Sequence, residues 1–106
     1  MIEELTPSEY LGRCRAGELW QLVDVREQWE IETASIENTI NIPLRDLPSR
    51  LSELDPGRPV AFICHSGGRS ARAAVLCAAS GHQRVANIRG GIDAWSDTVD
   101  PAIPRY

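Results

Sequence analysis

The chain has 106 residues, of which 42 % are hydrophobic and 25 % are charged, and this composition is typical of one globular domain. Acidic residues outnumber the eleven basic ones, all arginines, and the net charge of −4 provides no basic surface for nucleic acid or an anionic membrane. The acidic start lacks a signal-peptide pattern, and no apolar run approaches the ~20 residues that span a bilayer, so we expect a single cytoplasmic domain over residues 1–106 that binds neither nucleic acid nor membrane.

A capping motif near the start of the chain predicts the first helix. Thr6 can accept a hydrogen bond from the first helical turn, Pro7 suits the first helical position, and Glu9 completes a capping box. We expect this helix to run to about Ala16 and to stop at Gly17.

Strand and helix patterns alternate through the rest of the chain. Apolar stretches rich in β-branched residues predict buried strands at residues 19–25, 39–43, 59–64 and 84–88. Helical patterns occupy residues 44–54, 69–80 and 90–95. The tail, residues 100–106, contains two prolines and is expected to lie irregularly over the surface. The alternation predicts an α/β fold, a parallel sheet of four or five strands with helices on both faces.

The three cysteines form neither a disulfide framework nor a metal-binding pattern. Their number is odd, and no two of them are separated by only two residues. Cys77 falls in a helix of small residues, where we expect it to pack in the core, and Cys14 on the first helix has no comparable chemical context. Cys64 differs from both because it ends an apolar strand and begins a glycine-containing loop.

Cys64 is predicted to be a nucleophile because the segment CHSGGR surrounds it with groups that attract negative charge. Ligands of parallel sheets gather at the carboxyl ends of the strands, where Cys64 lies. Gly67 and Gly68 let the loop turn its backbone N–H groups inward, and the following helix directs its positive end at the same place. Arg69 adds a permanent positive charge. A cysteine that ends a strand is more often inert core, but this loop favours a reactive thiolate.

Four segments together resemble the single-domain rhodanese-like sulfurtransferases. The loop ICHSGGRSARAA is similar to the active-site loop of that family, and LVDVREQWE is similar to its Asp-Val-Arg segment. INIPL resembles the strand that follows, and NIRGGIDAW resembles the closing Gly-Gly-x-x-x-Trp motif. Because the segments occur in the family's order and spacing, the resemblance implies a rhodanese-like sheet with helices on both faces.

The resemblance implies that Cys64 carries a sulfur atom between two substrates. Its thiolate takes the outer sulfur of thiosulfate or of a persulfide, and the Cys64 persulfide then passes this sulfur to cyanide or to a thiol, which can belong to a protein. Arg69 holds the anionic donor, and Asp24 and Arg26 support the site. No metal or other cofactor is implied. The outer sulfur is bound by the backbone N–H groups of His65, Ser66, Gly67, Gly68, Arg69 and Ser70.

Other functions are compatible with parts of this pattern. Cysteine-dependent phosphatases and arsenate reductases place five residues between cysteine and arginine, whereas four separate Cys64 from Arg69 and Ser70 stands at the longer spacing. A rhodanese-fold regulatory module without turnover commonly lacks the loop cysteine, which this chain keeps. A redox sensor needs a second thiol near Cys64, and nothing in the sequence places one there.

Four side chains away from the loop have expected structural roles. Asn38 stands where many relatives carry glycine, and asparagine is the best other residue for a left-handed backbone position. We expect the three tryptophans to be packing residues, since large aromatic side chains dominate core energetics. They are Trp20, Trp29 and Trp95.

The sequence also gives expectations for His65 and for two glutamates, Glu27 and Glu30, near the predicted site. We expect the His65 side chain to point to solvent while its backbone N–H binds the ligand. Glu27 and Glu30 are expected to pair with Asp24 and Arg26, because all four belong to one short segment.

Overall fold

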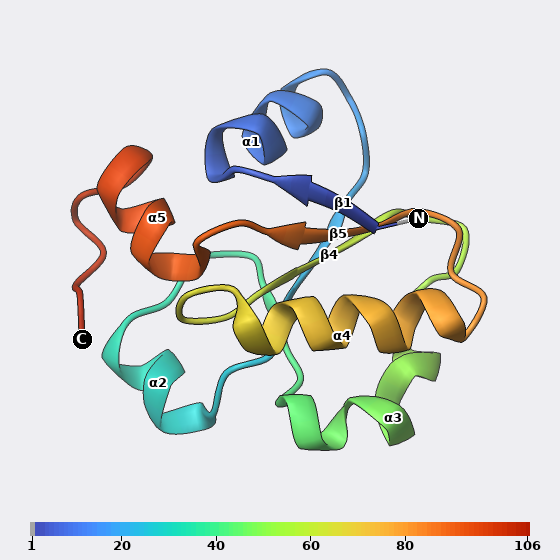
Figure 1. Ribbon diagram of the computed structural model, residues 1–106. Coiled ribbons are helices and arrows are strands. Elements are labelled where there is room, and N and C mark those ends of the chain that lie inside the picture. Colours follow the sequence, from blue (N-terminus) through green and yellow to red (C-terminus); the bar gives the residue numbers. More distant parts are fainter. Residues whose placement is uncertain (1) are drawn as a thin grey trace.

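The fold is a five-stranded parallel sheet with helices on both faces, as the computed structural model shows for residues 2–106 (Figure 1). The strands are ordered β1-β5-β4-β2-β3, and the predicted α/β class is confirmed. The strands are β1 (Ile2–Leu5), β2 (Gln21–Asp24), β3 (Ile40–Asn41), β4 (Val60–Ile63) and β5 (Val85–Ile88). The helices are α1 (Pro7–Arg15), α2 (Gln28–Thr33), α3 (Leu47–Arg50), α4 (Gly68–Ala79) and α5 (Gly91–Thr98).

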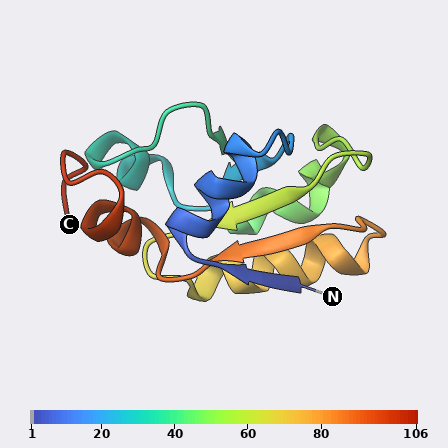
Figure 2. The same cartoon turned by 90° about the horizontal axis from the view of Figure 1, so that it is seen from above.

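Helices cover both faces of the sheet (Figure 2), and alternate residues of the central strands pack into a core on each face. Every residue of β2, β4 and β5 is buried, as expected for a parallel sheet covered on both sides. On the face covered by α1 and α5, Tyr10 contacts both Trp20 and Trp95. On the face covered by α3 and α4, Phe62 shares a core with Cys77, which confirms the predicted packing of that cysteine.

Two local signals in the sequence are confirmed. Glu9 N donates to Thr6 Oγ1 at 3.2 Å and Thr6 N donates to Glu9 Oε1 at 2.8 Å, which is the capping box expected for α1. Asn38 has a φ of 62°, so it occupies the left-handed position in place of glycine. Both signals are readable because the interacting groups lie within a few residues of each other.

Two elements were not predicted, β1 and α2. β1 reads IEEL and pairs with β5 at the edge of the sheet, and its two glutamates obscure the apolar pattern of a strand. The capping box of α2 is built from Glu27 and Glu30, without the serine or threonine that usually marks a helix start. Neither element carries the residue pattern from which a strand or a helix start is usually predicted.

The boundaries of two predicted helices differ from the structure. The segment 44–54 is not one helix, because α3 has four residues and lies between two 3₁₀ turns. α5 continues to Thr98, beyond the predicted end at Trp95. The longest helix, α4, has 12 residues, and no helix among residues 2–106 is long and apolar enough to cross a membrane.

The tail is irregular and mostly exposed, as predicted, apart from Ile103 and Tyr106, whereas the prediction for Trp29 is wrong. Ile103 in the tail is buried in the core under α5, because Ser96 Oγ donates to its carbonyl oxygen at 2.7 Å and holds the tail back against the domain. Tyr106 is half-buried and reaches the end of the sheet where β4 stops. Trp29 is 61 % exposed on α2, because that short helix turns this side chain away from the sheet.

The start of α5 approaches the segment after β4 closely enough to exclude any side chain at Gly91. Ile92 N donates to Cys64 O at 2.8 Å, and Asp93 N donates to His65 O at 3.2 Å. Gly91 has a φ of +60°, and a Cβ atom there would lie 2.4 Å from Cys64 O. This contact fixes the backbone of the loop that begins at Cys64.

We predict that Gly91→Ala lowers the free energy of unfolding by about 2–4 kcal/mol, because the methyl group strains the backbone and collides with two carbonyl groups. The measurement is urea unfolding monitored by tryptophan fluorescence. Gly12→Ala in α1 is the control, since a Cβ there meets nothing within 4 Å, and its stability should equal or exceed that of the wild type. Equal stability of both variants would contradict the close approach.

Candidate active site

Cys64 lies at the carboxyl end of β4, in the middle of the sheet, and only 1 % of the residue is exposed. Figures 1 and 2 place α2, α5 and the C-terminal end of the chain around this end of the strands. β2 ends beside it, because Asp24 is paired with Ile63 and Val25 N donates to Ile63 O at 3.0 Å. The segment that follows β2 therefore borders the loop that follows Cys64.

The loop supplies hydrogen-bond donors to the sulfur of Cys64. Gly67 N lies 3.1 Å from Cys64 Sγ, and Ser70 N lies 3.4 Å from it. Other backbone N–H groups of the loop donate to no acceptor among the residues that the structure describes, namely those of His65, Ser66, Gly68 and Arg69. The loop thus combines donors that hold the sulfur with donors that remain free for an anionic ligand.

The loop reaches this conformation through one left-handed residue, Gly67, whose φ is 114°. α4 begins directly after it, so the positive end of the helix faces the loop and Ser70 N points at the sulfur. Of the two glycines expected to let the loop turn, only Gly67 adopts a left-handed conformation. Gly68 is the first residue of α4, and its φ is not positive.

A chain of hydrogen bonds connects Cys64 to β1 at the edge of the sheet. Ser70 Oγ lies 3.3 Å from Cys64 Sγ and donates to Asn87 Oδ1 at 2.6 Å. Asn87 Nδ2 donates to Glu4 Oε1 at 3.0 Å. Because an ionised carboxylate only accepts, Asn87 presents its carbonyl oxygen to Ser70, which keeps a lone pair toward the Cys64 thiol. Sequence reasoning missed Asn87 and Glu4, although a polar residue within a buried strand was a signal for Asn87.

Asp24 and Arg26 form a buried ion pair with each other. Both side chains are fully buried, and Arg26 Nη2 lies 2.8 Å from Asp24 Oδ2. Other N–H groups of the guanidinium donate to Ala34 O at 2.7 Å and to Tyr106 Oη at 2.8 Å. The pair therefore joins the end of β2 to the end of α2 and to the C-terminal tail.

The carboxylates that were expected to partner this buried pair bind elsewhere, Glu27 to Arg45 and Glu30 to Arg69, although Glu30 O accepts from Arg26 Nη1 at 3.3 Å. Both Nη atoms of Arg69 donate to the Glu30 carboxylate, at 2.6 and 2.8 Å. These bonds lower the pKa of Glu30 to about 2 in spite of its burial, and they raise the pKa of Arg69. Both groups are therefore charged near neutral pH. The reason for the error is distance, because Arg69 lies 39 residues after Glu30.

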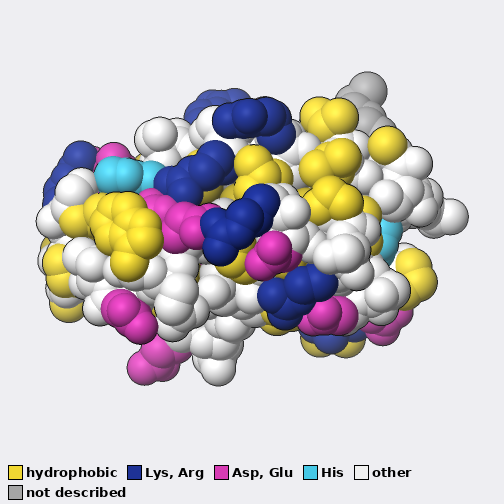
Figure 3. Space-filling view, turned by 90° about the horizontal axis from the view of Figure 1, so that it is seen from below, with side chains coloured by type: hydrophobic (Ala, Val, Ile, Leu, Met, Phe, Trp, Pro, Cys, Tyr) yellow, Lys and Arg dark blue, Asp and Glu magenta, His cyan; other side chains and the backbone are white. Residues whose placement is uncertain are grey.

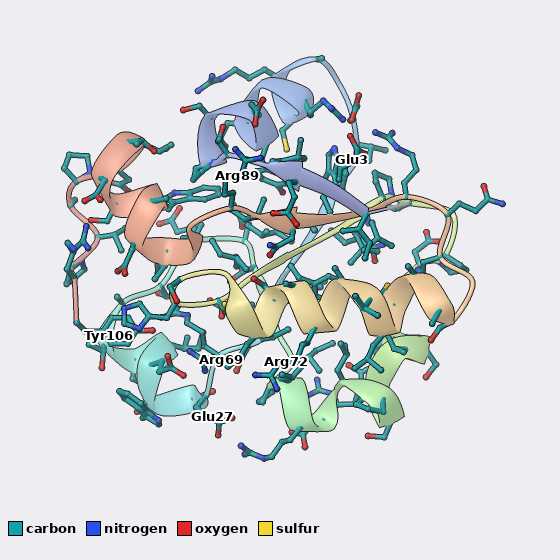
Figure 4. The ribbon with its side chains drawn as sticks, viewed as in Figure 1. Glu3, Glu27, Arg69, Arg72, Arg89 and Tyr106 are labelled. Atoms are coloured by element: carbon teal, nitrogen blue, oxygen red, sulfur yellow. The ribbon has the colours of Figure 1, made fainter. Side chains whose placement is uncertain are left out.

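Tyr106 closes one side of the site from the C-terminal tail. Its hydroxyl donates to Glu30 Oε2 at 2.7 Å, and its ring stacks on His65 with the ring centroids 4.1 Å apart. Burial raises the pKa of the Tyr106 hydroxyl to about 12, so it remains a donor near neutral pH. Figure 4 shows Arg69 and Tyr106 between α2 and the loop that precedes α4. No sequence signal pointed to Tyr106, since its partner Glu30 lies 76 residues earlier.

His65 does not point freely to solvent as predicted. Its ring is held between Tyr106 and the start of α5, where His65 Nε2 lies 3.2 Å from Asp93 Oδ1. Seen from below, the surface of the molecule interleaves basic and acidic side chains beside an apolar group (Figure 3). The described residues contain no group of three or more His, Cys, Asp or Glu side chains arranged to hold a metal ion.

This arrangement can stabilise negative charge on an atom bonded to Cys64 Sγ. The sulfur lies where two backbone donors and the positive end of α4 meet. Four residues separate Cys64 from Arg69, and two backbone N–H groups of this short segment converge on the sulfur.

Comparison with known proteins agrees with this geometry. The family model "Rhodanese-like domain" matches residues 6–98. The chain is 35 % identical over 96 residues to a protein of Allochromatium vinosum named sulfurtransferase, covering 91 % of this chain and 90 % of that protein. It is 43 % identical over 90 residues to rhodanese-like/PpiC domain-containing protein 12, chloroplastic, of Arabidopsis thaliana, covering 81 % of this chain but 30 % of that protein.

A solved structure with the same fold supports this relationship. The crystal structure of a rhodanese-related protein from Thermoplasma volcanium superimposes with a TM-score of 0.83 at 28 % sequence identity. The match covers 98 % of this chain and 99 % of that one. With its family model, its sequence relatives and its fold in agreement, the chain belongs to the family of rhodanese-like domains.

Proposed function

We propose that residues 1–106 act as a sulfurtransferase that moves a sulfane sulfur from a donor to a thiol acceptor through a persulfide on Cys64. The observation that carries the proposal is the loop around Cys64 Sγ, which holds the sulfur with two backbone donors and leaves others unpaired. Family membership and a relative named sulfurtransferase support the same reaction class. The reaction needs only the thiolate, the loop and a donor, without a cofactor.

In the first step Cys64 takes a sulfur atom from the donor. The thiolate attacks the outer sulfur of thiosulfate, an S–S bond to Cys64 forms, and the bond to the sulfonate sulfur breaks. Sulfite leaves with that electron pair, and the persulfide anion remains on Cys64. A donor of the form R–S–SH reacts in the same way and releases R–S⁻. The free N–H groups of the loop stabilise the charge on the outer sulfur.

In the second step an acceptor removes the sulfur. A thiolate attacks the outer sulfur of the Cys64 persulfide, forms a new persulfide and releases the Cys64 thiolate, so charge and electrons balance. Cyanide reacts likewise and gives thiocyanate. The division of one transfer into two covalent steps predicts ping-pong kinetics. A protein thiol can serve as acceptor if it reaches the loop between Tyr106 and the start of α4.

Redox sensing through a Cys64 disulfide receives no support from the positions of the other cysteines. Cys77 lies on α4 nine residues after Gly68, a rise of about 14 Å along the helix. It is fully buried, and burial raises the pKa of its thiol to about 11. Cys14 packs against the core on the α1 face of the sheet. Neither thiol is placed to resolve an oxidised Cys64.

We predict that Cys64→Ser abolishes sulfur uptake and leaves the fold intact, because Ser differs from Cys by one atom in a packed site. Intact-protein mass spectrometry before and after incubation with thiosulfate or a persulfide measures the added sulfur, and a cyanide chase should remove it. Cys77→Ser and Cys14→Ser should still gain one sulfur atom. Sulfur uptake by Cys64→Ser would remove Cys64 from the mechanism.

We predict that Arg69→Ala lowers kcat/KM for anionic donors by about 10–100-fold, the effect of losing one or two charge-assisted hydrogen bonds. The substitution also leaves the Glu30 carboxylate without its partner beside the site. Steady-state kinetics with thiosulfate and cyanide provide the measurement. Arg45→Ala removes a charge from an exposed ion pair and serves as the control. Unchanged kinetics in Arg69→Ala would contradict a role in donor binding.

A further inference from the structure

Three arginines on the segments around the Cys64 loop already have acidic partners. This matters because a doubly charged donor such as thiosulfate needs positive charge that is not already compensated. The pairs, each within the distance of an ion pair, are Arg69–Glu30, Arg26–Asp24 and Arg45–Glu27. The charge available to an incoming anion is therefore smaller than the number of arginines implies.

The Arg69–Glu30 pair adjoins the loop. Among the three pairs, it is the one that is not fully buried and is still held by several hydrogen bonds. Only 3 % of Glu30 is exposed, and its carboxylate accepts bonds from Glu27 N at 3.0 Å and from the Tyr106 hydroxyl at 2.7 Å besides those from Arg69. Glu30 cannot swing aside without breaking these contacts. Arg69 can therefore offer a donor only its remaining N–H groups, next to a fixed negative charge.

We propose that Glu30 makes this site select persulfide donors over thiosulfate, an inference that rests on the proposed sulfurtransferase function. Thiosulfate carries two negative charges, and its sulfonate oxygens must lie near Arg69, where Glu30 already occupies both Nη atoms. A persulfide R–S–SH carries at most one negative charge at its reacting end, on the outer sulfur. That sulfur requires the loop N–H groups and makes no demand on a free guanidinium.

The transferred atom and the leaving group support the same selection. With R–S–SH, the Cys64 thiolate forms a bond to the outer sulfur, the R–S bond to that sulfur breaks, and R–S⁻ leaves with one negative charge. With thiosulfate the leaving group is sulfite, with two negative charges that must pass the Glu30 carboxylate. The fixed carboxylate therefore opposes both the binding and the release steps of the thiosulfate reaction.

Arg72 is the remaining basic group on the first half of α4. It has no ion pair among the described residues, but its side chain is exposed on α4 and extends toward α3, whereas Arg69 extends toward α2 (Figure 4). Water and salt screen an exposed charge of this kind, so it attracts anions in general without gripping a donor at Cys64. It does not replace the charge that Glu30 cancels.

The first test measures thiosulfate binding without turnover. Isothermal titration calorimetry gives the dissociation constant of thiosulfate for Cys64→Ser and for Cys64→Ser/Glu30→Gln at fixed ionic strength. We expect about tenfold tighter binding in the double variant, the effect of one charge-assisted bond regained by Arg69. Cys64→Ser/Glu32→Gln is the matched control, because Glu32 lies exposed on the same helix without an ion pair among the described residues, and it should bind like Cys64→Ser.

Unchanged or weaker thiosulfate binding in the Glu30→Gln variant would overturn the selection by Glu30. Circular dichroism verifies that each variant is folded. If Glu30→Gln does not fold, Glu30→Asn takes its place, since its shorter amide side chain also removes the carboxylate that Arg69 binds. Tighter binding is expected again, and its absence overturns the proposal in the same way.

The second test compares donors during sulfur loading. Mass spectrometry follows the rate at which Cys64 gains sulfur from glutathione persulfide and from thiosulfate. We expect the ratio of the two rate constants to fall about tenfold in Glu30→Gln and to stay unchanged in Glu32→Gln, which corrects for the intrinsic reactivity of each donor. An unchanged ratio in Glu30→Gln contradicts the inference. Absence of loading from either donor refutes the proposed function, while the binding comparison still decides the role of Glu30.

Discussion

The carbonyl groups of Cys64 and His65 are hydrogen-bonded to the first turn of α5, and the chemistry of the loop depends on this tie, that is, on these two bonds. Ile92 N donates to Cys64 O at 2.8 Å, and Asp93 N donates to His65 O at 3.2 Å. With its carbonyl groups held on that side, the loop has its N–H groups available for Cys64 Sγ and for a ligand. The tie exists because Gly91 lets two backbones approach closer than a Cβ atom allows.

A cluster of four buried or half-buried charges holds the segments that border the loop in place. The pairs Asp24–Arg26 and Glu30–Arg69 join the end of β2, α2 and α4, and the Tyr106 hydroxyl connects them by bonding to both Arg26 and Glu30. The cluster is neutral as a whole. It can therefore hold the loop in place without attracting anions strongly. The groups that position Cys64 are thus not the groups that attract a charged substrate.

The sequence predicted those parts of the fold and site that depend on neighbouring residues. The capping box at Thr6, the left-handed Asn38 and the loop between Cys64 and α4 involve groups a few positions apart, so their patterns are visible. The missed features join distant segments. Glu4 and Asn87 are 83 residues apart in the sequence, and Tyr106 and Arg26 are 80 apart. No local sequence pattern predicts either of these contacts.

The most direct test of this account is a crystal structure of the protein after loading with a persulfide donor. The account predicts one additional sulfur atom on Cys64 Sγ, within hydrogen-bonding distance of the loop N–H groups that are unpaired here, with the Arg69–Glu30 bonds unchanged. An additional sulfur that points away from these N–H groups, or that is attached to Cys14 or Cys77, would contradict it. The first result would link the backbone geometry to sulfur transfer, and the second would require a different chemistry for the site.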